Sequence, residues 1–90
     1  MTTRIETGPE LTFSSARGAL AAGLARIEAG ASEVDCASLS RFDSAALAVL
    51  LAWQRAAQAR GTTLAVLNVP PQLASLARAY GIDTLLAERH

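Results

Sequence analysis

Three stretches with the hydrophobic spacing of a helix, each followed by a glycine, constrain the fold of this chain more than any other feature. Glycine adopts without strain the left-handed conformation in which many helices end, so each stretch has a defined end. The predicted helices run from Ser14 or Ser15 to about Glu28, from about Ser44 to Arg60, and from Pro70–Pro71 to Tyr80, and the glycines are Gly30, Gly61 and Gly81.

The segments between these helices predict short strands. Val34–Leu39 alternates apolar and polar residues, as a strand with one buried face does. Thr63–Asn68 is a nearly continuous apolar run, which is typical of a strand covered on both faces. After the last glycine, Ile82, Leu85 and Leu86 predict a final strand or helical turn.

Around the turn sequence Gly8–Pro9, the apolar residues Ile5, Leu11 and Phe13 predict a short N-terminal β-hairpin. The predicted order of elements is therefore β-β-α-β-α-β-α. Strands that alternate with helices indicate an α/β fold, here a small mixed β-sheet with helices packed on it. Ninety residues, of which 51% are hydrophobic, suffice for one core, and we expect a single domain over residues 1–90.

Charge and cysteine content narrow the possible functions. The formal net charge is zero and the eight basic residues are scattered, which argues against a surface for nucleic acid or anionic lipid. Cys36 is the one cysteine, so no intramolecular disulfide can form and a reducing compartment is expected. No apolar run reaches the length of a membrane helix, and no signal-peptide pattern is visible. We therefore expect a cytoplasmic protein that meets a membrane only through a partner.

The sequence offers few residues for enzyme or metal chemistry. His90 is the sole histidine and is terminal, which argues against a Ser-His-Asp triad. One cysteine and one terminal histidine do not give the spacing of a metal site, and no glycine-rich phosphate loop is present. Cys36, on a predicted strand, fits a small buried side chain better than a reactive thiol. We expect a protein that is not an enzyme and that uses no cofactor or metal.

The junction Asp43–Ser44, at the start of the second predicted helix, is the strongest candidate for a functional site. Asp is a preferred N-cap residue and its charge suits the positive end of a helix, so Asp43 can be a cap and Ser44 a first-turn residue. Ser44 can also contact a partner. It can also accept a phosphate group, which a helix N-terminus stabilises. Spacing alone leaves these three roles open.

The helix that begins at Ser44 is apolar almost all round in its first two turns, and polar residues appear only from Gln54 onward. A helix that covers one face of a small sheet should keep a polar outer face. Two interpretations stand. The exterior is mildly apolar because the chain is rich in alanine, or it is a partner surface with Trp53 and Arg55 as anchors.

Three segments give the whole chain a resemblance to the STAS domain, the fold shared by anti-sigma-factor antagonists and the cytoplasmic tails of sulfate transporters. The resemblance implies that the family's Ser or Thr at the start of the second helix, here Ser44, lies at a partner contact. The chain departs from the commoner pattern at Ala46, where many members have Gly, which alters the approach of a partner backbone. The three segments are Leu11–Ala16, Val34–Leu39 and Asp43–Leu47.

Within this family the chain resembles the MlaB-like members, which are small standalone STAS subunits of Mla phospholipid transporters. The brief hairpin, the segment Leu73–Gly81 and the long apolar helix around Trp53 carry the likeness. It implies a non-catalytic cytoplasmic subunit, peripheral at the inner membrane through the transporter. The expected partner is an MlaF-like ABC ATPase, in a complex with an MlaE-like permease and an MlaD-like protein. Such a complex moves phospholipids and maintains outer-membrane lipid asymmetry.

The resemblance also implies which residues meet the ATPase, with Ser44 as an unmodified contact residue in one apolar patch. The alternative is an anti-sigma-factor antagonist, in which a partner kinase phosphorylates Ser44 and only the unmodified form binds. The expected contact residues are Ser44, Leu47, Val49 and Trp53, with a polar edge at Arg41 and Asp43.

Overall fold

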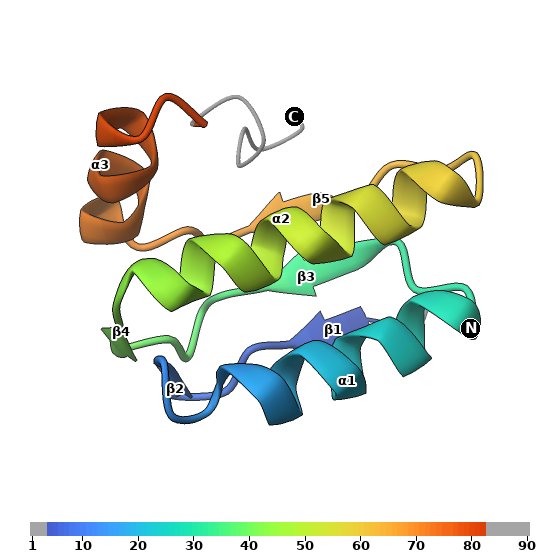
Figure 1. Ribbon diagram of the computed structural model, residues 1–90, viewed down its shortest axis with the longest axis horizontal. Coiled ribbons are helices and arrows are strands. Elements are labelled where there is room, and N and C mark those ends of the chain that lie inside the picture. The colour runs from blue at the N-terminus through green and yellow to red at the C-terminus, as the bar shows by residue number, and fades with distance from the viewer. Residues whose placement is uncertain (1–3, 83–90) are drawn as a thin grey trace.

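The computed structural model describes residues 4–82, which form an α/β fold with three helices and two small sheets (Figure 1). This confirms the predicted fold class, and each predicted helix is present with ends close to those expected. The three glycines that follow the helices all have positive φ. The strands are β1 (Arg4–Glu6), β2 (Glu10–Leu11), β3 (Glu33–Asp35), β4 (Arg41–Phe42) and β5 (Ala65–Leu67), and the helices are α1 (Ala16–Glu28), α2 (Ser44–Ala59) and α3 (Pro71–Ala79).

All strand pairs in this part of the chain are parallel. One sheet has the order β1-β3-β5, and β2 and β4 form the other. Ile5, Val34 and Val66 lie side by side across the three-stranded sheet. Because parallel neighbours need a crossover connection, α1 joins β1 to β3 and α2 joins β3 to β5.

The three-stranded sheet has one buried face and one more exposed face. The central residue of each strand is buried, and the residues on either side of it are exposed or half-buried. On the exposed face the Arg4 guanidinium lies 3.1 Å from the Glu33 carboxylate and 3.3 Å from that of Asp35. Helices α1 and α2 lie over the buried face, and α3 lies near the start of α2 (Figure 1). The largest side chains in this core are Trp53, Leu11, Ile27, Leu50, Leu73, Val34 and Val66.

The predicted N-terminal hairpin is wrong, because β1 pairs with β3 and β2 pairs with β4. Gly8 has a φ of 71°, and the carbonyl of Pro9 accepts hydrogen bonds from the backbone N–H groups of Ser40 and Arg41, each at 3.0 Å. The turn therefore leads the chain across to β4 instead of back along β1. As a result, the sheet that was expected to be mixed has only parallel neighbours within residues 4–82.

The strands differ from the prediction in two further ways. The predicted strand Val34–Leu39 ends at Asp35, because the Asp35 carboxylate accepts the N–H of Ala37 at 2.9 Å and the chain turns there. Strand β4 was not predicted, since two residues show no alternation. Phe13, which was expected in the hairpin, lies in the turn before α1.

Of the predicted C-terminal element only Ile82 is described. It packs against the core, and its N–H donates to the carbonyl of Ala77 at 2.9 Å. Leu85, Leu86 and His90 lie outside the described residues. None of the helices within residues 4–82 combines the length and apolar character that crossing a bilayer requires.

Helices α1 and α2 meet where Gly23 faces Trp53. The Trp53 side chain is 1% exposed, and its indole Nε1 donates a hydrogen bond to the carbonyl of Leu20 at 3.2 Å. Gly23 is buried, and a Cβ built there would overlap the indole ring. The absence of a side chain at Gly23 therefore sets how closely the two helices approach.

Replacing Gly23 with alanine should destabilise the protein by about 1–3 kcal/mol, because the added methyl group overpacks the contact with Trp53. Urea unfolding measures the change. Gly18→Ala is the matched control in the same helix, since a Cβ there meets nothing within 4 Å. It should stabilise the protein by about 0.5–1 kcal/mol through helix propensity. Equal effects of the two substitutions would contradict this account of the helix contact.

The Asp35 carboxylate, at the end of β3, contacts side chains from β1 and from the residue that follows β5. Its Oδ1 accepts from the Asn68 side chain and from the Ala37 N–H, both at 2.9 Å. These hydrogen bonds, in that order, hold the pKa of Asp35 below its ordinary value of 3.8, with help from the Arg4 guanidinium and against desolvation. Asn68 has a φ of 57°, a conformation that asparagine tolerates better than most residues.

Because the folded state lowers the Asp35 pKa, the ionised carboxylate stabilises the fold above the unfolded pKa. That contribution is lost as the pH falls below 3.8 and through the folded pKa. Asp35→Asn should therefore lower the free energy of unfolding at pH 7, and the difference from the parent should shrink toward pH 3. Urea titrations across this range test it. Glu28→Gln, whose carboxylate makes no ion pair or hydrogen bond within residues 4–82, should show no such trend.

Candidate functional site

The start of α2 is built by the carboxylate of Asp43. Its Oδ1 accepts the backbone N–H of Ala45 at 2.8 Å, so Asp43 is the N-cap of the helix. This is one of the roles that the sequence predicted for the junction. The Oδ2 of Asp43 accepts the backbone N–H of Phe13 at 3.0 Å. One carboxylate thus caps α2 and fixes the turn before α1 beside it.

Ser44 is the first residue of α2 and is exposed. Its hydroxyl makes no hydrogen bond to any group within residues 4–82. The capping role belongs to Asp43, so the Ser44 hydroxyl stays available at the surface. Ala46, where many STAS domains have Gly, is fully buried and contributes to the core.

Two depressions in the surface meet at Ser44 and Ala48. The larger, of about 1070 Å³, lies between α2 and the start of α1. The smaller, of about 370 Å³, lies between α2 and the end of α3 and also reaches Leu51. Arg17 and Asp43 place one positive and one negative side chain in the larger depression.

Large exposed apolar side chains stand at the two sides of this region. Phe13 is 86% exposed and lines the larger depression, and Tyr80 is 61% exposed and lines the smaller one. Within residues 4–82 these two are the exposed large hydrophobic residues. We refer to the surface formed by Phe13, Ser44, Ala48, Leu51 and Tyr80 as the Ser44 face.

Three of the residues expected in the partner patch belong to the core instead. Leu47 and Val49 are each 3% exposed, and Trp53 is 1% exposed. Leu47 and Val49 form part of the floor of the depressions but offer almost no surface to a partner. Trp53 points toward α1, where its indole is hydrogen-bonded to Leu20. That expectation is corrected because all three side chains pack into the hydrophobic core.

The polar edge of the expected patch is only partly assembled. Asp43 and Ser44 both line the larger depression. Arg41 is exposed on β4 opposite Glu10 and lines neither depression. Phe13 and Tyr80 were not predicted as site residues. A large aromatic residue in a polar turn between Thr12 and Ser14 is the sequence signal that marks Phe13.

Two kinds of site considered from the sequence are not assembled among residues 4–82, namely a metal cluster and a carboxylate pair. No group of three or more His, Cys, Asp or Glu residues in this part of the chain is placed to hold a metal ion. Asp35 and Asp43 each have their own hydrogen-bond partners and do not form a carboxylate pair. Cys36 is buried. The exposed side chains of the Ser44 face are suited to binding another surface.

Asp43→Ala should destabilise the protein by about 1–2 kcal/mol, because it removes the helix cap and the acceptor for the Phe13 N–H. Ser44→Ala is the adjacent control and should change the free energy of unfolding by less than about 0.5 kcal/mol. Urea unfolding of both variants tests the assignment. A larger loss in Ser44→Ala than in Asp43→Ala would make Ser44 the cap.

Comparison with known proteins agrees with this geometry. A family model described as "Mlab, STAS domain" matches residues 2–87. Among solved structures, the anti-sigma factor antagonist SpoIIAA in its unphosphorylated form superposes with a TM-score of 0.74. The superposition has 18% sequence identity and covers 97% of this chain and 78% of that chain, so it shows the fold alone. Comparison with curated proteins finds no match. Since the family model spans nearly the whole chain, this protein belongs to the MlaB-type STAS domain family.

Proposed function

We propose that this protein is a non-catalytic STAS subunit that binds and supports the ATPase of an Mla-type ABC transporter through the Ser44 face. The observation that carries the proposal is the exposed apolar surface at the start of α2, with Phe13 and Tyr80 at its two sides. A contiguous apolar patch with a polar rim is typical of a protein interaction site, and aromatic residues are frequent anchors. The match to the MlaB-type family supports the transporter role.

The free energy gained by burying the exposed aromatic side chains is consistent with a binding role. Full burial of one large apolar side chain contributes about 1.5–3 kcal/mol, so Phe13 and Tyr80 together contribute about 3–6 kcal/mol. A micromolar complex requires about 8 kcal/mol in total. Association also costs several kcal/mol of translational and rotational freedom, so burial of the two aromatic side chains offsets part of that cost and does not by itself give the affinity.

In this proposal the direct partner is an MlaF-like ATPase, assembled with an MlaE-like permease and an MlaD-like protein. The protein is cytoplasmic and reaches the inner membrane only through that complex. The complex moves phospholipids and maintains outer-membrane lipid asymmetry. Ser44 lies between the two aromatic residues, where its free hydroxyl can pair with a polar group of the ATPase.

A second candidate function is that of an anti-sigma-factor antagonist switched by phosphorylation of Ser44. The observation that favours it is the exposed Ser44 hydroxyl, which no group within residues 4–82 engages. A phosphate there would add nearly two negative charges in the middle of the Ser44 face and would oppose the binding of an apolar partner. The same surface serves both functions, and only the partner differs.

Ser44→Asp should weaken co-purification with the MlaF-like ATPase by at least about tenfold, because it places an unpaired carboxylate within the interface. The fold should survive, since a negative charge in the first turn suits the helix N-terminus. Phe13→Ser should have a similar effect through lost apolar burial. Affinity capture of the co-expressed ATPase, with circular dichroism of each variant, measures both.

Ser75→Asp is the matched control, because Ser75 is exposed on α3 and lines neither depression. It should leave capture of the ATPase unchanged. Unimpaired capture by both Ser44→Asp and Phe13→Ser would refute the assignment of the Ser44 face. Incubation with an anti-sigma-factor kinase and ATP, followed by intact mass measurement, separates the two functions. A phosphate found on Ser44 favours the antagonist role, and an unmodified mass favours the transporter role.

A further inference from the structure

The outer edge of β1 is open. β1 ends the sheet order β1-β3-β5, and its pairing with β3 places Glu6 opposite Asp35. The N–H of Thr7 donates to the carbonyl of Asp35 at 3.2 Å, so the odd-numbered residues direct their backbone groups toward β3. Alternate residues of a strand direct theirs to the other side. The N–H and C=O groups of Arg4 and Glu6 therefore point outward, and nothing within residues 4–82 pairs with them.

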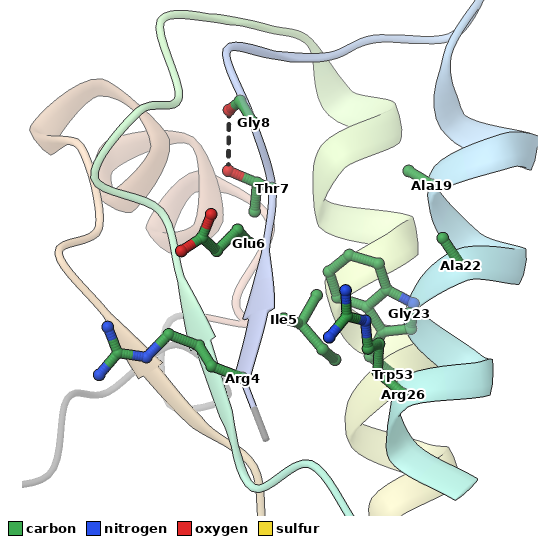
Figure 2. Close-up of a pocket in the computed structure, with 10 residues that line it drawn as sticks. All are labelled: Arg4, Ile5, Glu6, Thr7, Gly8, Ala19, Ala22, Gly23, Arg26 and Trp53. Carbon is green, nitrogen blue, oxygen red and sulfur yellow. Dashed lines mark hydrogen bonds between the residues drawn. The ribbon is translucent and has the colours of Figure 1, made fainter. Parts of the chain in front are cut away.

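A groove of about 660 Å³ runs beside this edge, between β1 and α1 (Figure 2). Ile5 and the Trp53 indole are directed toward this space. The facing side of α1 carries the small residues Ala19, Ala22 and Gly23 and, at one end, the cationic Arg26. An added strand whose side chains alternate would place every second side chain into this groove, against Ile5, the indole and the small residues of α1.

The charges along the edge determine what an added strand must carry on its other face. Arg4 and Glu6 lie on the opposite side of β1 from Ile5 (Figure 2). Arg4 is already paired with Glu33 and Asp35. Glu6 is exposed and forms no ion pair or hydrogen bond within residues 4–82. Directly opposed charges of opposite sign stabilise strand pairing, so Glu6 selects a basic residue across from it.

The position of α1 decides whether a second copy of this chain or a separate extended segment can pair with the open edge of β1. The sequence Arg4–Ile5–Glu6 would be charge-complementary to itself in an antiparallel pair with a second copy. In Figure 1, however, α1 lies on the far side of β1 from β3, beyond the open edge. Two-fold pairing of β1 strands would bring both α1 helices into the same space, which helices about 10 Å wide cannot share. A bare extended segment has no such helix and fits beneath α1.

We propose that the outer edge of β1 binds an extended segment of a partner protein as an added antiparallel strand. The segment places a basic residue opposite Glu6 and apolar side chains in the groove against Ile5 and Trp53. The antiparallel direction lets one residue of the segment exchange both backbone hydrogen bonds with Glu6. None of the groove residues belongs to the Ser44 face, so this second interaction surface does not depend on the proposed function.

Two peptides test the proposal on the intact protein. The first is an acetylated and amidated peptide of sequence TVKVTVT, and the second has glutamate in place of the lysine. Trp53 is the chain's one tryptophan and lines the groove, so its fluorescence reports binding. The lysine peptide should give a saturable change, and the glutamate peptide should bind about tenfold more weakly because its carboxylate faces Glu6.

Two substitutions at Glu6 separate charge from backbone pairing. Glu6→Lys should reverse the preference, so that the glutamate peptide binds more tightly. Glu6→Pro removes an outward N–H and keeps the pairing with β3, as prolines on edge strands do, and should weaken both peptides by about tenfold or more. Glu28→Lys is the control for Glu6→Lys, since Glu28 is exposed on α1 outside the groove, and should leave binding unchanged.

Three results would overturn the proposal. The first is the absence of a saturable fluorescence change up to millimolar peptide. The second is binding that does not respond to the charge exchange or to Glu6→Pro in variants with unchanged circular dichroism. The third is a dimer of the protein alone in analytical ultracentrifugation that Glu6→Pro dissociates, because a second copy would then occupy the edge.

Discussion

The two hydrogen bonds that the Asp43 carboxylate accepts hold the functional end of the molecule together. One oxygen caps α2, and the other fixes the backbone of Phe13, which is 30 residues away in the sequence. The hydrogen bonds between Thr12 and Ser15 shape the turn that carries Phe13, and the second Asp43 bond fixes that turn beside the start of α2. One side chain therefore both caps α2 and positions the turn that carries Phe13.

The contact between Gly23 and Trp53 has a comparable effect along the rest of α1. The indole is held at the carbonyl of Leu20 and against the Cα of Gly23, so the distance between α1 and α2 is fixed by direct packing. Trp53 and Gly23 themselves line the groove against β1, so this contact forms part of its wall. Buried glycines in helices cost stability through backbone entropy, and here the close approach of an indole ring offsets that cost.

The sequence predicted the helices well because each has a hydrophobic period of several turns and a glycine after it. The Asp43 cap was also predictable, since few other residues suit that position. The strands were harder to predict, because segments of two or three residues show no period and their partners are set by the turn at Gly8–Pro9. The hairpin was the natural local solution, and the hydrogen bonds from Ser40 and Arg41 to Pro9 override it.

The burial of α2 shows what could not be predicted from the sequence. Its first turns are apolar on every side, so hydrophobic spacing does not tell which side faces the sheet. Leu47, Val49 and Trp53 are the bulkier residues, and the core takes them, because burying large side chains gives the greater free-energy gain. The small and polar residues Ser44 and Ala48 are left outside. The large apolar side chains exposed at this end of α2 are then Phe13 and Tyr80, which lie outside the helix.

The Ser44 face and the edge of β1 would recognise a partner through different kinds of interaction. The Ser44 face offers side chains, namely two aromatic rings and the Ser44 hydroxyl, while the edge of β1 offers backbone groups that nothing within residues 4–82 pairs with, beside a groove. Side-chain recognition is lost by substitution of single anchors, whereas backbone recognition tolerates most substitutions and fails at proline. Helix α1 borders both surfaces, and Trp53 holds it in place. A partner that binds at one surface therefore does not need to shift the helix that borders the other. In the two proposals, the Ser44 face and the edge of β1 therefore bind their partners at separate places on the domain.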